Sequence, residues 1–247
     1  MWIHDLRRGT LNKLTSDGAR NGAAIWTVDG KKVIFQSAKT GVLNLSWKAS
    51  DGRGGEEALD TAKNNQFPDA VSMDGQTLTF TEIDPVTGRD LWRLSLKDRQ
   101  RTKFLQTAAN ESNSALSPDG RWIAYQSDRS GRDEIYVQPF PGPGSEELIS
   151  TEGGTAARWS RSGRELLYRS GDKMMAVAVA TQPALHASKP ELLFEKPYWS
   201  RRFYPSYDVA SDGRFVMIKP NEQVAGATVM QVVLHWTDEL KRRVPAR

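Results

Sequence analysis

The side chains best suited to chemistry in this chain stand just upstream of five short polar turns. They comprise carboxylates, carboxamides, one guanidinium, one hydroxyl and two phenols. A small number of such groups can orient a polar ligand in a pocket, and carboxylate and amide oxygens are also suitable ligands for a hard divalent cation. The candidate ligand-binding residues are Asn21, Gln66, Asp69, Glu111, Asn113, Thr155, Arg158, Tyr204 and Tyr207.

Other kinds of catalytic centre are absent from the sequence. The chain has no cysteine, which excludes disulfides and thiolate chemistry. Its three histidines, His4, His186 and His235, are far apart and lack zinc-ligand spacing. There is no Gly-x-Ser-x-Gly nucleophile elbow. The Gly-rich phosphate loop and His-Arg-Asp catalytic loop of protein kinases are also missing, so kinase activity is excluded.

Charge and hydropathy limit the partners. The formal net charge is +4, from 34 basic and 30 acidic residues that are scattered along the chain. A small surplus distributed in this way does not indicate a nucleic-acid partner. The longest apolar runs, such as Val229–Leu234, are too short to span a membrane. Met1–Asp5 does not have the pattern of a signal peptide, and the sequence leaves the cellular compartment open.

The five turns recur about 45 residues apart. An Asp-Gly pair favours a type I′ hairpin turn, in which both central residues adopt positive φ. Repeats of about 40–50 residues that consist of short strands are typical of β-propeller blades. The turns are Asp29-Gly30, Asp74-Gly75, Asp119-Gly120, Ser162-Gly163 and Asp212-Gly213.

The runs on either side of each turn predict a four-stranded antiparallel blade, because they alternate between apolar and polar residues and are rich in aromatic side chains. We therefore predict an all-β fold: a β-propeller of five blades plus an N-terminal strand pair, with an incomplete six-bladed ring as the alternative. One domain over 1–247 would contain closing strands in 1–15, blades at 21–60, 65–106, 111–150, 155–194 and 203–236, and a tail at 237–247 with a helical turn.

The two ends of the chain differ from the repeats. Trp2–Leu6 and Asn12–Thr15 are interpreted as the third and fourth strands of a blade whose first two strands are missing. We expect them to close the ring beside Val229–Trp236. The missing strands predict that Met1 begins inside a longer parent protein. The unpaired strand edges favour a homodimer through edge pairing.

Several stretches carry a family resemblance. The motif Ser117-Pro118-Asp119-Gly120 and the strand that follows it resemble the repeat of TolB-type β-propellers, as do Asp133–Pro141 and Arg158–Leu166. Tyr207–Pro245 is similar to the end of the sensor-like propellers attached to bacterial serine/threonine kinases and winged-helix regulators. The resemblance extends over essentially the whole chain. It departs from the repeat at Val28 and Met73, where the turn proline is missing, and at Ser162, which replaces the aspartate.

The resemblance implies a non-catalytic binding or sensory module within a bacterial regulatory protein, whose parent chain is in some cases anchored in a membrane. The starts of the inner strands of a propeller gather around one mouth of its central channel. The candidate residues would therefore meet there and bind a small polar ligand or a protein partner, with no cofactor.

A calcium-dependent propeller hydrolase, acting as an esterase, lactonase or phosphotriesterase, is the alternative. Asp69 and Glu111 would be the catalytic acids. The metal ligands would be Asn21, Asp69, Glu111 and Asn113, which have the oxygen chemistry that Ca²⁺ prefers.

Overall fold

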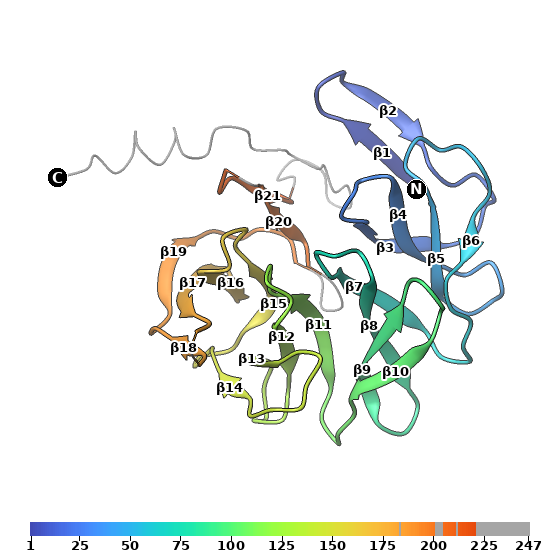
Figure 1. The fold of residues 1–247 in the computed structure, drawn as a ribbon. Helices are drawn as coiled ribbons and strands as arrows, with labels where there is room; N and C mark the ends of the chain where they lie inside the picture. Colours follow the sequence, from blue (N-terminus) through green and yellow to red (C-terminus); the bar gives the residue numbers. More distant parts are fainter. Residues whose placement is uncertain (183, 201–204, 211, 221–247) are drawn as a thin grey trace.

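Successive antiparallel sheets follow one another around a common axis, in the order of the chain (Figure 1). The computed structural model describes residues 1–182, 184–200, 205–210 and 212–220, and all regular elements within these ranges are strands. The chain is thus an all-β propeller with four complete blades, one blade described in part and an N-terminal hairpin. Among the described residues there is no helix long and apolar enough to cross a membrane.

Two complete blades form the first half of the ring. In each blade the strands pair in sequence order, and the innermost strand comes first. The outermost strand of the first blade is only two residues long, which leaves little exposed edge. The first blade contains β3 (Asn21–Trp26), β4 (Lys32–Ser37), β5 (Asn44–Ala49) and β6 (Glu57–Ala58), and the second contains β7 (Gln66–Val71), β8 (Thr77–Asp84), β9 (Gly88–Ser95) and β10 (Arg101–Leu105).

The third and fourth blades repeat this plan. In the fourth blade the outermost position is divided, because both β18 and β19 pair with opposite ends of the long strand β17. The third blade contains β11 (Glu111–Leu116), β12 (Trp122–Ser127), β13 (Glu134–Pro139) and β14 (Glu147–Leu148), and the fourth contains β15 (Thr155–Trp159), β16 (Glu165–Ser170), β17 (Lys173–Ala180), β18 (His186–Ala187) and β19 (Glu191–Glu195).

The remaining strands form two-stranded sheets next to each other in the ring. Strands β20 (Tyr207–Val209) and β21 (Phe215–Met217) begin the fifth blade, and β1 (Trp2–Asp5) pairs with β2 (Thr10–Lys13) beside the first blade (Figure 1). The predicted closing strand Val229–Trp236 and the C-terminal helical turn lie outside the described residues.

The hairpin turns differ from the predicted type I′ geometry. Of the paired turn residues only the glycines have positive φ, for example +70° at Gly120, whereas Asp119 is not among the described residues with positive φ. Asp119 instead accepts hydrogen bonds from the backbone N–H of Arg121 and from the Ser117 hydroxyl, at 3.1 and 2.6 Å. The Ser117 hydroxyl in turn accepts the N–H of Trp122. Aspartate is used here as an acceptor that organises a longer loop.

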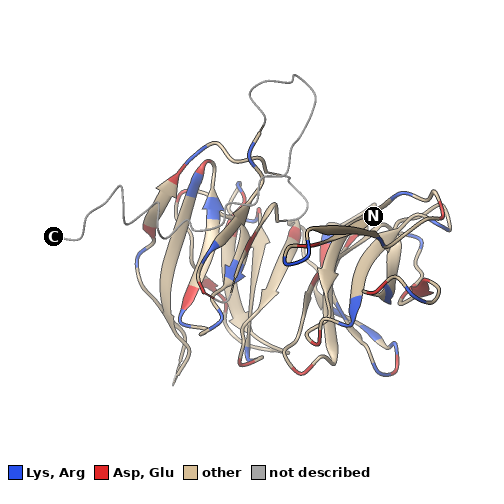
Figure 2. Ribbon diagram, turned by 90° about the horizontal axis from the view of Figure 1, so that it is seen from above, with Lys and Arg blue, Asp and Glu red and all other residues tan. Residues whose placement is uncertain are grey.

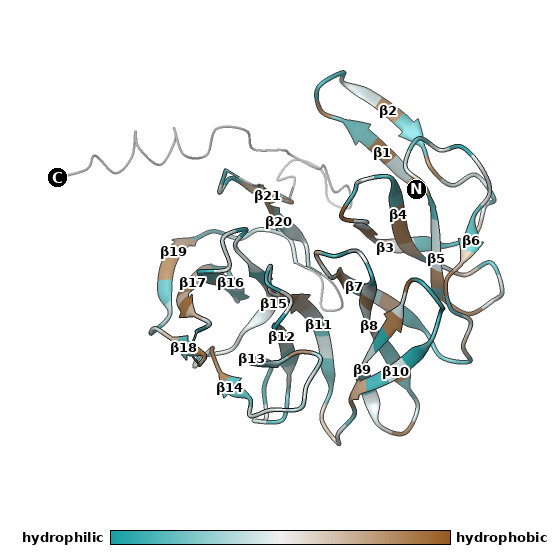
Figure 3. Ribbon diagram, viewed as in Figure 1, coloured by the Kyte–Doolittle hydropathy of each residue, from teal (hydrophilic) through white to brown (hydrophobic). Residues whose placement is uncertain are grey.

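Apolar side chains are buried between sheets, and five separate clusters fill the spaces between neighbouring elements of the ring. Hydrophobic segments accordingly lie on strands such as β4, while the connecting loops are more polar (Figure 3). Acidic and basic residues are interspersed over the molecule (Figure 2). Representative buried residues are Phe35 at the N-terminal hairpin, Phe80 between the first two blades, Tyr125 between the second and third, Tyr168 between the third and fourth, and Met217 between the fourth and fifth.

We predict that Ser117→Ala destabilises the protein by about 1–2 kcal/mol, because the buried Ser117 hydroxyl donates a hydrogen bond to Asp119 and accepts one from the Trp122 N–H. Urea unfolding measures the change. Ser130→Ala is the control, since the hydroxyl of Ser130 is in an exposed turn and donates only to the Arg132 carbonyl. Equal effects of the two substitutions would show that the hydroxyl of Ser117 does not organise the turn.

Candidate functional site

Each of the four complete blades has a β-bulge in its innermost strand, where two residues oppose one on the neighbouring strand. The first bulge residue has positive φ at Ala23, Asn113 and Ala156, with φ of 45°, 54° and 56°. In the second blade that place belongs to Pro68, whose ring holds φ negative. Positive φ is unfavourable for residues other than glycine, and backbone strain of this kind concentrates at functional sites.

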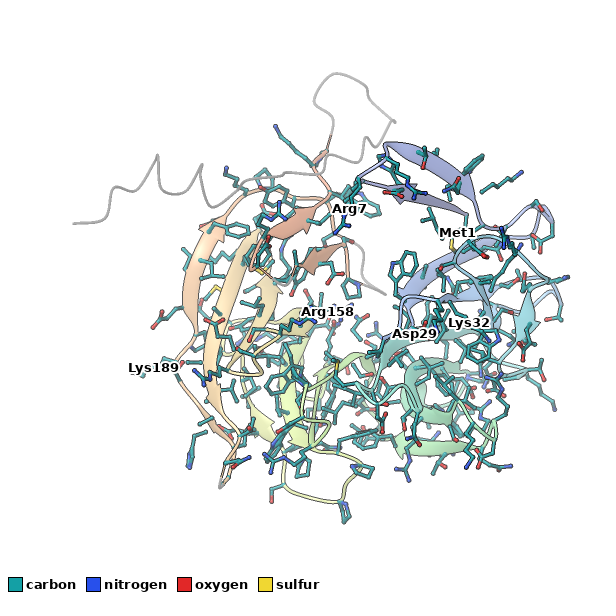
Figure 4. The ribbon with its side chains drawn as sticks, turned by 45° about the horizontal axis from the view of Figure 1, so that its top comes forward. Met1, Arg7, Asp29, Lys32, Arg158 and Lys189 are labelled. Carbon is teal, nitrogen blue, oxygen red and sulfur yellow. The ribbon has the colours of Figure 1, made fainter. Side chains whose placement is uncertain are left out.

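A cavity of about 590 Å³ lies at the axis, beyond these bulges and towards the hairpin turns. Its walls come from the innermost strands β3, β7, β11, β15 and β20. Three predicted site residues line it: Asp69, Arg158 and Tyr207. Figure 4 shows Arg158 near the centre of the ring, whereas Lys189 lies at its outer edge. Segments far apart in the sequence therefore meet at this one cavity.

Asp69 is buried in the wall between the second and third blades, with 7% of its surface exposed. Its Oδ2 accepts hydrogen bonds from the hydroxyls of Thr81 at 2.9 Å and Ser114 at 3.0 Å. The Ser114 hydroxyl also lies 2.9 Å from Thr79 Oγ1. Burial raises the pKa of Asp69 to about 7, against the opposing effects of these hydroxyls and of Arg158. Asp69 thus changes its charge near neutral pH.

Tyr207 is a structural member of the cavity wall. Its hydroxyl donates to the Ala156 carbonyl at 2.7 Å and lies 3.2 Å from the Leu167 carbonyl oxygen. These contacts join the fifth blade to the bulge of the fourth. Burial raises the pKa of the Tyr207 phenol well above its usual value, so the phenol stays neutral and donates a hydrogen bond to the backbone.

Arg158 is half-buried, and its Nη1 donates to the carbonyl of Ala157 at 3.0 Å. It forms no ion pair within the described part of the chain, although Asp69 lines the same cavity. A guanidinium has five N–H donors. The cavity therefore contains a cation with unused hydrogen-bonding capacity.

Of the other described candidates, none lines this cavity. Asn21, Gln66, Glu111 and Thr155 are the first residues of their inner strands, and Asn113 lies in the bulge of β11. Gln66 is buried and donates to Asp60 at 2.7 Å, and Asn113 donates to Gln126 at 3.1 Å. Their separation from the cavity has a geometric cause, since a six-residue strand such as β3 extends about 17 Å from its first residue to its last.

The remaining members of that group have local partners. Asn21 donates to the Ala19 carbonyl at 3.0 Å, and Thr155 donates to the Arg169 carbonyl at 3.4 Å. Glu111 is buried beside Thr107, whose hydroxyl donates to it, and burial raises its pKa. Tyr204 lies outside the described residues.

The sequence reasoning overlooked the apolar rim of the cavity. Trp26 and Trp159 are both the last residue of an innermost strand, so an alignment of the repeats could have found them. Met73 stands in the place of the turn proline and is 54% exposed. The Trp159 indole N–H donates to the Ala115 carbonyl at 3.1 Å, which fixes this ring against the third blade.

The four residues suggested as calcium ligands do not all line this cavity. Of Asn21, Asp69, Glu111 and Asn113, only Asp69 lines the cavity, and its burial favours the protonated form. The described ranges contain no cluster of three or more His, Cys, Asp or Glu residues placed to hold a metal ion.

The fold is that of TolB-type β-propellers. TolB from Acinetobacter baumannii superposes with a TM-score of 0.71 at 20% identity, over 90% of this chain and 54% of that protein. An oligogalacturonate lyase from Vibrio parahaemolyticus gives 0.61 at 13% identity, over 91% and 65% of the two chains. A gluconolactonase from Xanthomonas campestris gives 0.53 at 16% identity, over 74% and 66%.

These similarities define the fold and leave the function open, because one fold supports many activities. This chain spans about half of the TolB structure that it matches. No known protein-family profile matches the sequence.

We predict that the free energy of unfolding of the wild type, relative to that of Asp69→Asn, decreases as the pH is raised from 4 to 8. The pKa of Asp69 rises from 3.8 to about 7 on folding, so between these values only the folded state keeps the proton, and stability is lost as pH increases. The full difference is on the order of 4 kcal/mol. Urea unfolding of both proteins across this range measures it.

Asp98→Asn provides the control for this comparison. Asp98 is exposed, and the hydroxyl of Ser95 and the N–H of Gln100 lower its pKa, so its removal should not reproduce the effect. Parallel stability curves for the wild type and Asp69→Asn would contradict the assignment of a proton to Asp69 at neutral pH.

Proposed function

We propose that this chain is a non-catalytic binding module that takes a small polar ligand or a protein partner at the axial cavity. The observation that carries the proposal is the convergence of five innermost strands on one cavity, which is lined by two carboxyl groups (Asp69, Asp208), two guanidinium groups (Arg158, Arg161) and an indole rim. Cavities of several hundred Å³ with a few convergent polar groups are typical of ligand sites.

The cavity is also well placed for a sensory role. Side-chain hydrogen bonds in its wall connect neighbouring blades, such as those of Ser114 with Asp69 and of Tyr207 with the Ala156 carbonyl. A ligand that contacts several blades stabilises their mutual packing, because binding favours the conformation to which the ligand binds. In a longer regulatory protein such a module would report occupancy of the cavity.

The hydrolase is the second candidate, supported by the superposition on a gluconolactonase and by the placement of Asp69 in a cavity. A carboxyl group with a pKa near 7 has the properties of a general base. Glu111, the other predicted acid, does not line the cavity, and of the four suggested calcium ligands only Asp69 does. The binding role therefore has the stronger support.

We expect purified protein to hydrolyse p-nitrophenyl acetate, paraoxon and gluconolactone no faster than Asp69→Asn does, in either calcium or EGTA. The reason is that the cavity provides Asp69 without its predicted partners. Initial rates with each substrate provide the measurement. EGTA-sensitive turnover that disappears in Asp69→Asn would reverse the order of the two candidates.

A defined set of organic acids, amines, sugars and amides can be screened for binding. We expect some of these compounds to bind the wild type and not the Ala70→Trp variant. Ala70 lines the cavity, so an indole at this position fills it. Saturation-transfer NMR detects the binding. Ala58→Trp, on the exposed outer strand β6, is the control. If every compound that binds the wild type also binds Ala70→Trp, the axial cavity is not the site.

A further inference from the structure

We infer that the axial cavity selects an organic carboxylate with an aromatic body, and that Arg158 holds the carboxylate. This inference rests on the proposed binding function and adds to it the chemical class of the ligand. Its basis is the combination, in one cavity, of an indole rim and a half-buried guanidinium that forms no ion pair with any described residue.

The first observation is the incomplete pairing of Arg158. Among the described residues its hydrogen-bond partner is the Ala157 carbonyl, at 3.0 Å from Nη1. A half-buried guanidinium is poorly solvated and gains free energy when an anion pairs with it. Because its donors form a planar fork, a carboxylate can pair with it through two parallel hydrogen bonds.

The second observation is that the nearby acids do not neutralise Arg158. Asp69 is oriented by the hydroxyls of Thr81 and Ser114, and it forms no ion pair with Arg158. Asp208 also lines the cavity, but its side chain is exposed and accepts the N–H of Val209 at 2.8 Å. Neither of these two carboxylates pairs with Arg158, so its guanidinium keeps donors for an anionic ligand.

The third observation is the apolar rim. Trp26, 51% exposed, ends strand β3 of the first blade, and Trp159 follows Arg158 on β15. Met73 lies at the same cavity. The ring of a ligand can stack on an indole or contact the methionine sulfur, which adds affinity beyond area burial. An aromatic body on the carboxylate uses both features of the cavity.

Binding of phenylacetate and phenylacetamide tests this inference, because the two compounds differ only in the charge and hydrogen-bonding of the head group. The protein contains eight tryptophans, so 5-fluorotryptophan labelling and ¹⁹F NMR give a resonance for each. Trp26→Phe and Trp159→Phe assign the two signals from the rim. We expect phenylacetate to shift these signals and to bind about tenfold more tightly than phenylacetamide.

Arg158→Gln should reduce the affinity for phenylacetate about tenfold and leave that for phenylacetamide unchanged. Arg158→Lys, which keeps the charge and loses the fork, should give an intermediate affinity. Arg164→Gln is the matched control, since Arg164 is an exposed arginine on the same blade and does not line the cavity. Circular dichroism of each variant confirms that it is folded.

Equal affinities for the acid and the amide, or an Arg158→Gln protein that binds phenylacetate as the wild type does, would overturn the inference. Tighter binding of phenyl phosphate than of phenylacetate would show that the cavity selects a phosphate and not a carboxylate. If only sugars or amines bind, and do so in the wild type but not in Ala70→Trp, the cavity is a ligand site and the inference about the carboxylate is wrong.

Discussion

Burial of apolar side chains between successive sheets is the interaction on which the rest of this structure depends. The five hydrophobic clusters lie between neighbouring elements of the ring. Each sheet packs on the next, and the right-handed twist of the sheets directs their innermost strands to a common centre. The clusters leave the axis open, and the cavity there is lined by apolar residues such as Ile25 and Trp159 together with the polar Asp69 and Arg158.

The innermost strands combine two requirements. They must pair with a regular second strand and also leave space at the axis. A bulge in the innermost strand of each of the four complete blades satisfies both requirements. The bulges direct side chains such as Asp69 and Ser114 towards one another across neighbouring blades. Asp69 is a bulge residue, whereas Arg158, Trp159 and Trp26 follow the bulges in regular register. Together they give the cavity a mixed polar and apolar character suited to binding.

The elements of the fold could largely be predicted from the sequence. The alternating runs around Asp29-Gly30, Asp74-Gly75 and Asp119-Gly120 correspond to paired strands, because turn chemistry and alternation act over a few residues. The geometry of those turns was predicted incorrectly, since the preceding Ser or Thr was not recognised as the partner of the aspartate. Of the candidate site residues, Asp69, Arg158 and Tyr207 share a cavity, and Gln66, Glu111 and Asn113 lie elsewhere.

The sequence by itself determined the strand repeat, the succession of blades and the residue types available at the axis, because these follow from local hydrogen bonding and periodicity. Only the tertiary structure decided which end of the inner strands encloses a cavity, that Asp69 is buried in its wall, and that Arg158 has no ion pair among the described residues. Those outcomes depend on contacts such as that between Ser114 and Asp69, 45 residues apart. No local pattern encodes such a distance, because it arises from the packing of one whole sheet on another.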